Sequence, residues 1–361
     1  TAPIDNADDL AIVYTPGVAR VVEEIAEKPE KAREYTIKKN TVAVVTDGSA
    51  ILGLGDRGPL AALPVMEGKA ALFSRFADVD AFPICLDAHE VEDIVAHVKA
   101  IAPAFAGINL EDISAPRCFE IEDRLRAELD IPVFHDDQHG TAVCVLAALT
   151  NALTIVEKPI EEVRIAMSGA GAAGTAILRL LLAAGARDVI VTNSKGIVRE
   201  GREAGDRLEW IARHTNPRKV KGGLREAVAG TDVFIGVSVP NILDEAMLRS
   251  MNERAIVFAL SNPVPEVDPE IAWKHAAVVA TGRSDFANQI NNVLAFPGVF
   301  RGLIDAHACE VTDEALLAAA QAIASVVSNE ELSARHIVPS VFDERVTPAV
   351  ARAVARTGEP R

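Results

Sequence analysis

Ile-Pro-Val-Phe-His-Asp-Asp-Gln-His-Gly-Thr, residues Ile131 to Thr141, is the stretch that decides the fold. A short apolar run ends in two adjacent aspartates, and small and apolar residues with helical character follow from Ala142 to Leu153. This order is typical of a buried strand in an open α/β sheet, where ligands bind outside the carboxyl ends of the strands. An earlier segment ends in the same way at Glu111 and Asp112. The two acidic strand ends predict a site at one edge of a sheet, although an acidic turn can also be merely solvated.

Strand-like and helical segments alternate on both sides of this stretch, which indicates parallel βαβ units. In the first half we expect strands at 41–46, 80–85, 105–109 and 132–134, helices at 64–76 and 90–100, and a third helix that Ser114 can cap and Pro116 can open. In the second half we expect strands at 163–168, 188–192, 232–237, 255–260 and 277–280. Terminal helices are expected at 313–327 and 348–356, the last with Thr347 as its cap.

We therefore predict an α/β protein with two doubly wound parallel sheets. A chain of 361 residues is long enough for two cores. Residues 1–155 are expected to form an N-terminal α/β domain that carries the catalytic and metal-binding residues. Residues 156–300 are expected to form a Rossmann dinucleotide-binding domain, and residues 301–361 a C-terminal helical segment that packs back on the body.

Composition argues against several classes of protein. With 49% hydrophobic and 24% charged residues, the chain is ordinary for a soluble globular protein. The net charge of −16 and the lack of a basic block argue against a nucleic-acid partner. No uninterrupted apolar run reaches the roughly 18 residues that a membrane span needs. Four cysteines without a C-x-x-C pair predict reduced thiols and a cytoplasmic protein.

A glycine-rich motif, Gly169-Ala170-Gly171-Ala172-Ala173-Gly174, follows the strand expected at 163–168 and precedes a helical segment. Glycines at this spacing allow a tight turn and a close approach of a dinucleotide pyrophosphate to a helix N-terminus, although a structural turn is the alternative. The next strand is followed by Asn193, Ser194 and Lys195 instead of an acidic residue for the ribose of NAD. Ser194 and Lys195 can bind a 2′-phosphate, which favours NADP over NAD, but Asn193 can also bond a free ribose.

Three carboxylates come from the two acidic strand ends, those of Glu111, Asp112 and Asp137. Such a set suits Mg²⁺ or Mn²⁺, which prefer oxygen ligands, and the alternative is an acidic rim without a metal. His135 and His139 are four residues apart, but His135 precedes the helix that would align them. We therefore expect locally hydrogen-bonded histidines and no zinc site.

Two further residues have both a structural and a chemical interpretation. Lys69 shares a helical stripe with Met66 and Phe73, and a lysine on an apolar stripe can extend its ammonium group to water. Alternatively, desolvation lowers the pKa of Lys69 and allows it to act as a general base. Tyr14 is one of two tyrosines and precedes Thr-Pro-Gly, where its phenol can pack or take part in chemistry.

Seven motifs occur in order along the chain. They are YTPGVA (Tyr14–Ala19), TDGSAILGLGD (Thr46–Asp56), GK (Gly68–Lys69), INLED (Ile108–Asp112), FHDDQHGT (Phe134–Thr141), SNP (Ser261–Pro263) and NNVLAFPG (Asn291–Gly298). With these motifs the chain resembles malic enzymes of the short prokaryotic type. The resemblance runs from Tyr14 to about Gly302, which is four-fifths of the chain.

The resemblance implies roles for the residues of the acidic edge. Lys69 matches the general base of the family and Tyr14 its general acid, while Asp136 matches a carboxylate beside the lysine that would hold and tune it. The residues that match the metal ligands are Glu111, Asp112 and Asp137.

The resemblance also concerns the substrate. Asn262 and Asn292 match asparagines that bind the carboxylate or hydroxyl of malate. Larger members of the family carry an arginine directly before the ILGLGD segment, where this chain has Ala50. The substrate carboxylate must therefore be bound by other groups, and Ser49 is a candidate beside the two asparagines.

The implied activity is the oxidative decarboxylation of L-malate to pyruvate and CO₂, with reduction of NAD(P) and a divalent cation. In short family members the tyrosine and the lysine are thought to be supplied across a dimer interface, so a homodimer with a shared active site is expected. Two alternatives stay open at this point: a two-domain dehydrogenase that does not decarboxylate, and a nucleotide-binding protein without catalysis.

Overall fold

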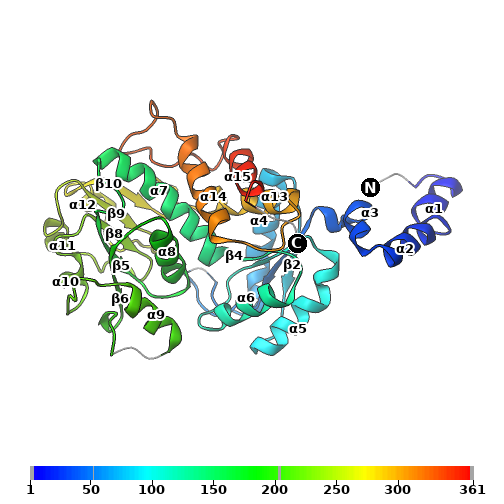
Figure 1. Ribbon diagram of the computed structural model, residues 1–361, viewed down its shortest axis with the longest axis horizontal. Helices are drawn as coiled ribbons and strands as arrows, with labels where there is room; N and C mark the ends of the chain where they lie inside the picture. The colour runs from blue at the N-terminus through cyan, green and yellow to red at the C-terminus, as the bar shows by residue number, and fades with distance from the viewer. Residues whose placement is uncertain (1–3, 52, 202–204, 358–361) are drawn as a thin grey trace.

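The computed structural model describes residues 4–51, 53–201 and 205–357, and its body contains two sheets (Figure 1). The first sheet has the strand order β2-β1-β3-β4, with β1 (Thr41–Thr46), β2 (Asp80–Cys85), β3 (Gly107–Leu110) and β4 (Val133–His135). All neighbouring strands in it are parallel. The connections run through α4 (Pro59–Ala77), α5 (Val91–Ile101), the 3₁₀ turn η3 (Ala102–Ala104) and α6 (Arg117–Glu128).

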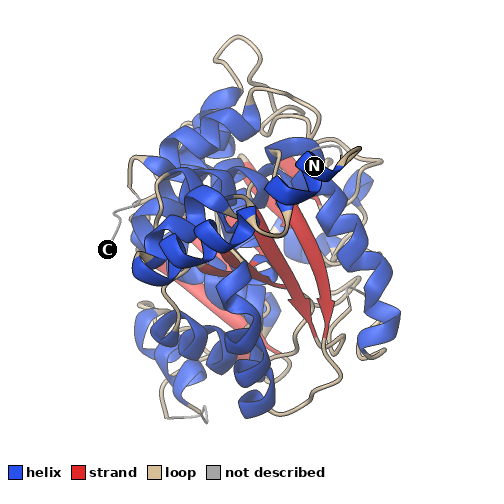
Figure 2. Ribbon diagram, turned by 90° about the vertical axis from the view of Figure 1, so that its right-hand side faces the viewer, coloured by secondary structure: helices blue, strands red, loops and turns tan. Residues whose placement is uncertain are grey.

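Both faces of β1, a central strand of the first sheet, are buried. Val42 and Val44 of β1 belong to one hydrophobic core, and Ala43 and Val45 belong to another. Because successive side chains of a strand point to opposite faces, the two cores lie on opposite sides of the sheet. Helices accordingly flank the strands on both sides (Figure 2), as parallel sheets require.

The second sheet has the strand order β10-β9-β8-β5-β6-β7. Its strands are β5 (Arg164–Ser168), β6 (Asp188–Asn193), β7 (Gly196–Ile197), β8 (Val233–Gly236), β9 (Ala255–Ala259) and β10 (Ala276–Thr281). Its helices are α8 (Ala172–Ala183), α9 (Asp206–His214), α10 (Leu224–Val228), α11 (Glu245–Arg249) and α12 (Pro269–Ala272). The predicted α/β class is confirmed. One strand differs from the prediction: β7 pairs antiparallel with β6, and two residues are too few to give a strand pattern.

The strand order fixes where ligands can bind. In the first sheet β2 lies on one side of β1, and the next strand along the chain, β3, lies on the other side. In the second sheet β6 and β8 lie on opposite sides of β5 in the same way. A crevice opens at the carboxyl ends of the strands where the order reverses in this manner. The crevices are therefore expected beside Glu111, which follows β3, and beside Gly169, which follows β5.

The helix α7 (Thr141–Val156) connects the two sheets and is largely buried. The C-terminal helices α13 (Phe296–Asp305), α14 (Asp313–Val326) and α15 (Val346–Ala355) join the same core. Phe73 of α4, for example, contacts the rings of Phe296 and Phe300, with centroids 4.8 and 5.2 Å away. The prediction that the C-terminal helices pack back on the body is confirmed.

The N-terminal helices form an arm that projects from the body (Figure 1). The arm consists of α1 (Ala7–Val13), α2 (Gly17–Glu27), η1 (Pro29–Lys31), α3 (Ala32–Tyr35) and η2 (Ile37–Lys39). None of these elements contains a buried residue. Several apolar side chains of the arm are exposed, among them Ile12, Tyr14 and Val22.

Three predicted helix starts were wrong, and each involves a proline. Helix α4 begins at Pro59 and contains Pro64, and α15 begins at Val346, so that Thr347 is inside the helix and does not cap it. Helix α6 begins after Pro116 without a side-chain cap from Ser114. A proline lacks only an N–H that is unpaired anyway in the first turn, so it does not mark one fixed position there.

The segment 136–156 is long and apolar enough, by composition alone, to cross a membrane. No uninterrupted apolar run in the sequence indicates it, because polar residues interrupt the segment. In the structure this segment lies between the two sheets, and 72% of its most apolar window is buried in the protein. Its apolar character is therefore accounted for by core packing.

Candidate active site

The register of the first sheet brings the acidic strand ends together. Leu110 of β3 is paired with His135 of β4, so the residues that follow them, Glu111 and Asp136, leave the sheet side by side. Helix α4 packs on β1 and β2 and contributes Lys69, whose Nζ contacts both of these carboxylates. Its neighbour on the helical stripe, Met66, is fully buried and holds α4 against the sheet.

Lys69 is the centre of this arrangement. Its Nζ lies 2.6 Å from Asp136 Oδ2 and 3.0 Å from Glu111 Oε1, and its side chain is 10% exposed. The ammonium group therefore does not extend to water, which excludes that alternative. Burial by itself lowers the pKa of Lys69, but attraction by Asp136 and Glu111 outweighs burial, so the pKa is raised. The expectation of a lowered lysine pKa was wrong because it ignored these two carboxylates.

Three carboxylates form a compact cluster next to Lys69. One oxygen each of Glu111, Asp112 and Asp137 can be chosen so that all lie within 4.8 Å of one another. Burial raises the pKa of Glu111 well above its usual range; Lys69 opposes this, and the neighbouring aspartates add to it. A divalent cation would offset this repulsion, and carboxylate oxygens are the ligands that Mg²⁺ and Mn²⁺ prefer. The three residues therefore fit such a cation, and they are the ones that would hold it.

Asp112 has an unusual backbone conformation. Its φ of 53° lies in the left-handed region, which costs a non-glycine residue free energy and often marks a functional site. Two hydrogen bonds of its main-chain groups hold this conformation. The Asp112 N–H donates to Asp137 Oδ2 at 2.9 Å, and the Asp112 carbonyl accepts from the N–H of Ala50 at 2.9 Å.

A partly buried ion pair between Asp47 and Arg117, which no sequence pattern predicts, holds the turn after β1. Asp47 is fully buried and accepts from Arg117 Nη2 at 2.7 Å. The Ser49 hydroxyl donates to Asp47 Oδ1 at 2.6 Å and accepts from the Ser114 N–H at 2.9 Å. Ser49 thus joins the turn to the loop after Asp112, and these two bonds occupy its hydroxyl. No sequence signal pairs Asp47 with Arg117, because 70 residues separate them.

The two asparagines differ in their surroundings. Asn292 Nδ2 donates to Asp136 Oδ2 at 3.1 Å, and Asn292 Oδ1 accepts from the Thr141 hydroxyl at 3.1 Å. Asn292 is therefore part of the lysine cluster. Asn262 follows β9 and faces the turn of the first domain, where a side chain at Gly53 would come within 3.4 Å of the Asn262 carbonyl oxygen.

The two histidines have different environments. His139 Nε2 lies 2.6 Å from Glu122 Oε1, as expected for a locally hydrogen-bonded histidine. His135 is fully buried, and neither of its ring nitrogens has a hydrogen-bond partner in the part of the chain that the structure describes. The expectation of a local hydrogen bond was therefore wrong for His135, whose Nδ1 lies 3.8 Å from Asp137 Oδ2, too far for a hydrogen bond. Neither histidine belongs to the carboxylate cluster.

The glycine-rich loop after β5 uses its three glycines differently. Gly169 has a φ of 117°, and a Cβ at Gly174 would come 2.0 Å from the Gly169 carbonyl oxygen, so the first and third glycines are sterically required. A Cβ at Gly171 would meet nothing within 4 Å, which leaves open space in front of the loop. Helix α8 begins there without a side-chain cap. The loop and the helix N-terminus therefore fit a dinucleotide pyrophosphate.

The polar residues after β6 form a tight turn into β7. Asn193 Oδ1 accepts from the N–H of Lys195 at 2.8 Å, and Ser194 and Lys195 are exposed. The turn lies beside β5 and hence on the side of the glycine-rich loop where the adenosine ribose of a dinucleotide binds.

Tyr14 is not part of this site within one chain. It ends α1 on the projecting arm, and it is 66% exposed (Figure 1). Lys69, by contrast, contacts carboxylates of its own chain. Lys69 therefore meets these carboxylates within one chain, whereas Tyr14 lies apart from them, and a site shared across a dimer interface stays a prediction.

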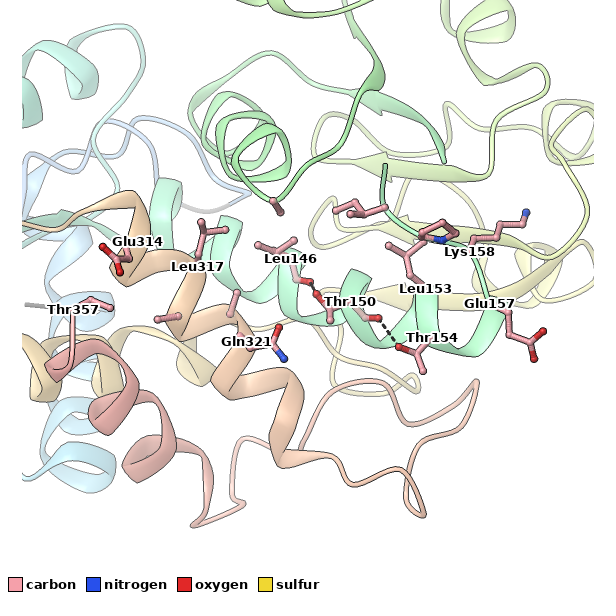
Figure 3. Close-up of a pocket in the computed structure, with 15 residues that line it drawn as sticks. Leu146, Thr150, Leu153, Thr154, Glu157, Lys158, Glu314, Leu317, Gln321 and Thr357 are labelled. Atoms are coloured by element: carbon pink, nitrogen blue, oxygen red, sulfur yellow. Dashed lines mark hydrogen bonds between the residues drawn. The ribbon is translucent and has the colours of Figure 1, made fainter. Parts of the chain in front are cut away.

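A separate groove of about 760 Å³ lies between α7, α14 and the segment before β5 (Figure 3). Its walls are largely apolar, with side chains such as Leu146, Leu153 and Leu317. The hydroxyls of Thr150 and Thr154 donate to carbonyls of their own helix, at 2.8 and 3.1 Å. No residue of the lysine cluster, the carboxylate cluster or the glycine-rich loop lines this groove, so it is distinct from the candidate active site.

Comparison with known proteins gives consistent matches over nearly the whole chain. Residues 1–126 match the model of the malic enzyme N-terminal domain, and residues 138–358 match that of the malic enzyme NAD binding domain. The chain is 58% identical to an NAD-dependent malic enzyme of Geobacillus stearothermophilus, over 99% of this chain and 76% of that protein. It is 53% identical to a bifunctional malic/malolactic enzyme of Bacillus subtilis, over 98% of this chain and 87% of that protein. Relatives at lower identity include NADP-dependent malic enzymes.

Among solved structures, an NAD-dependent malic enzyme from Thermotoga maritima superposes with a TM-score of 0.95 at 50% identity. The superposition covers 98% of this chain and 95% of that one.

Proposed function

The chain belongs to the malic enzyme family, which carries out the oxidative decarboxylation of malate with NAD(P), and from this premise we propose that the residues around Lys69 perform that reaction here. The observation that carries the proposal is the buried contact of Lys69 with Asp136 and Glu111, beside a cluster of three carboxylates. The two alternatives, a dehydrogenase without decarboxylation and a nucleotide-binding protein without catalysis, have no comparable support.

We propose Lys69 as the general base. Its Nζ accepts the proton of the malate C2 hydroxyl while the C2 hydrogen leaves as hydride. Asp136 directs the ammonium group through its 2.6 Å contact, and Asn292 orients Asp136 by donating to the same oxygen. Because the pKa of Lys69 is raised by Asp136 and Glu111, the lysine must lose part of that attraction before it can act. Glu111 is also one of the three carboxylates that would hold a divalent cation. When it binds such a cation, its attraction on Lys69 would weaken.

Two bound groups complete the chemistry. When bound, a nicotinamide cofactor supplies the hydride acceptor, and Mg²⁺ or Mn²⁺ supplies a Lewis acid for the C2 oxygen. The residues that would hold the cofactor are those of the loop Gly169–Gly174, whose open side faces away from Val237. The residues that would hold the cation are Glu111, Asp112 and Asp137.

The substrate carboxylates need donors other than the arginine that Ala50 replaces. Asn262 and Asn292 can donate through their amide groups. The Ser49 hydroxyl would first have to leave Asp47, to which it donates at 2.6 Å, so we assign it the weaker contribution.

We propose that the C3–C4 bond of the oxaloacetate formed by oxidation then breaks, which releases CO₂ and leaves an enolate, and that Tyr14 from the partner in a homodimer protonates C3 of this enolate to give pyruvate. Within one chain Tyr14 lies on the arm, exposed and outside the lysine cluster. The arm also exposes Leu10, Ile12 and Val22, and such exposed apolar groups mark protein interfaces. A second copy of this chain is the occupant that would both cover these groups and receive the tyrosine.

The two sheets suggest how the chain divides into domains. We propose residues 1–155 as the catalytic domain, 156–300 as the NAD(P) domain and 301–361 as the supporting helices. The four strands of the first sheet precede residue 156, and the six of the second follow it.

The choice between NAD and NADP rests on the turn after β6. Asn193, Ser194 and Lys195 provide no carboxylate against a 2′-phosphate, and this favours NADP. Curated relatives use either cofactor by name. We also propose the cytoplasm as the compartment, because Cys85, Cys118, Cys144 and Cys309 are all free thiols.

The test of the lysine assignment is the variant Lys69→Ala, assayed with malate, Mn²⁺ and either cofactor. Turnover should fall by about 10²- to 10⁴-fold, the usual effect of a lost general base. The dissociation constant of the reduced cofactor should stay the same, because Lys69 does not contact the glycine-rich loop. Lys99→Ala is the matched control, since Lys99 pairs with Glu128 on the surface. Near-normal turnover of Lys69→Ala would refute the assignment.

A further inference from the structure

Arg207 of α9 reaches back to the glycine-rich loop. Its Nη1 donates to the Ala170 carbonyl at 2.5 Å and lies 3.3 Å from the Thr175 hydroxyl. Ala170 is the second residue of the loop, and Thr175 lies in the first turn of α8. The guanidinium group therefore lies beside the uncapped helix N-terminus and the open space in front of Gly171.

The other side of Arg207 contacts the first domain. Its guanidinium carbon lies 4.6 Å from the ring centroid of Phe119 in α6, close enough for a cation–π interaction. Ala172, the first residue of α8, packs against the same core as Phe119. Arg207 thus bridges the helix of one domain and the nucleotide loop of the other, and Phe119 limits where its guanidinium can go.

The positive charge of Arg207 is not matched by a carboxylate. Within residues 4–51, 53–201 and 205–357, no Asp or Glu oxygen lies within 4.0 Å of its nitrogens, although other arginines such as Arg213 and Arg225 are paired. Burial lowers the pKa of Arg207, yet a guanidinium stays charged at physiological pH. A half-buried cation without a counter-charge is costly and favours an anion in the adjoining space.

We propose that Arg207 supplies the positive charge for the cofactor pyrophosphate, and that Phe119 positions its guanidinium at the loop. The inference rests on the glycine-rich loop as the cofactor site. It adds a residue that the G-x-G-x-x-G motif does not contain, since Arg207 lies more than 30 residues beyond the loop. A planar guanidinium suits this role because its donors can serve a phosphate oxygen while its face rests on an aromatic ring.

The test measures binding without malate or metal, by fluorescence titration with NADH and NADPH and by competition with ADP and adenosine. In Arg207→Leu, the dissociation constants of NADH, NADPH and ADP should each rise about 10- to 100-fold, the range expected for a lost charge-assisted hydrogen bond. Adenosine, which has no phosphate, should bind as before. The affinity of the wild type for ADP should also fall with added salt more steeply than that of the variant.

Arg213→Leu is the matched control, because Arg213 lies on the same helix and pairs with Glu209 on the surface. Phe119→Leu gives a second test that keeps the charge: ADP should bind several-fold more weakly, with adenosine unaffected. Unchanged ADP binding in both variants would overturn the proposal. An equal loss of affinity for ADP and adenosine would also overturn it, because that result indicates a structural role of Arg207. So would a loss of affinity for NADPH alone, because that result indicates a contact with the 2′-phosphate and not with the pyrophosphate. Failure of the malate assay alone would count against the proposed function and not against Arg207.

Discussion

At the scale of single residues, the two adjacent aspartates of the opening motif have different partners. Asp136 is fully buried and contacts Lys69 and Asn292, whereas Asp137 is partly exposed and accepts the Asp112 N–H. The separation arises because the chain leaves β4 at this point and enters a π-helical turn, η4 (Asp136–Gly140), which turns successive side chains in different directions. One aspartate is thereby available to the base and the other to a cation.

Gly140 provides a test of the Asp136 position. An added Cβ would come 1.9 Å from Asp136 Oδ1, while the φ of −61° at this residue suits alanine. Gly140→Ala should therefore displace the Asp136 carboxylate without straining the backbone, and kcat should fall by up to about 100-fold, as small misplacements of catalytic groups do. Steady-state kinetics with malate measures the effect.

Gly68→Ala is the control for that variant. Gly68 lies beside Lys69 on α4, and a Cβ there meets nothing within 4 Å. This substitution should leave kcat unchanged and stabilise the helix by about 0.5–1 kcal/mol. A Gly140→Ala protein with normal kcat would contradict the positioning role of Asp136.

Removal of the metal tests the carboxylate cluster. Treatment with EDTA should abolish turnover and Mn²⁺ should restore it. Added Mn²⁺ should also stabilise the wild type against unfolding, by about 2.7 kcal/mol at about 100 times the dissociation constant. In Asp137→Asn the stabilisation should be lost, and in Asp130→Asn, an exposed aspartate outside the cluster, it should persist. Equal stabilisation of both variants would argue against Asp137 as a ligand.

At the scale of secondary-structure elements, one buried carboxylate joins the starts of two neighbouring strands, β5 and β8. Asp232 immediately precedes β8 and is buried. It accepts from Lys158 Nζ at 2.7 Å, from the Arg164 N–H at 2.9 Å and from Asn252 Nδ2 at 3.0 Å. One side chain thus joins the linker after α7, the start of β5 and the loop before β9. Burial raises the pKa of Asp232, but these three bonds outweigh it, and the pKa is lowered.

Asp232→Asn should cost about 1–3 kcal/mol of stability near neutral pH, the range for hydrogen bonds to a charged group. A lowered folded-state pKa means that the carboxylate stabilises the fold above its unfolded pKa of about 3.9. This contribution is lost as the pH falls through the folded pKa. Urea unfolding of both proteins from pH 7 downwards should therefore show a difference that is constant above about pH 5 and shrinks in acid. A difference in unfolding free energy that stays constant at every pH would show that the charge of Asp232 does not stabilise the fold. Asp80 is exposed, so Asp80→Asn is the control and should have little effect on stability.

At the scale of the whole molecule, the N-terminal arm is the part whose apolar side chains stay exposed in a single chain. Its helices bury none of their residues, and Ile12 is 73% exposed. Ile12→Glu should therefore give a folded monomer with little activity, which sedimentation and circular dichroism can establish. Phe342→Glu, in the loop before α15 and 75% exposed, should leave the oligomeric state unchanged. A dimeric, active Ile12→Glu protein would contradict the proposed interface.

Complementation tests the shared site directly. Lys69→Ala and Tyr14→Phe should each be inactive, or nearly so, as pure proteins. Co-expressed, they should form mixed dimers in which one site combines an intact Lys69 with the partner's intact Tyr14, and activity should partly return. If Tyr14 served its own chain, mixing would restore nothing.

The sequence alone determined the fold class, the two sheets and the candidate chemical groups. Alternating strands and helices, the glycine spacing and the acidic strand ends are local patterns. They predicted that Glu111, Asp112 and Asp137 follow strand ends and that a tight loop begins at Gly169, because local main-chain geometry fixes where strands end and turns form. The tertiary structure decided the surroundings of those groups. It paired Lys69 with Asp136 across 67 residues, which raised the lysine pKa that desolvation alone would lower. It also placed Arg207 beside the glycine-rich loop. Contacts between distant segments depend on packing, and a pKa depends on every charge nearby, so neither follows from local sequence.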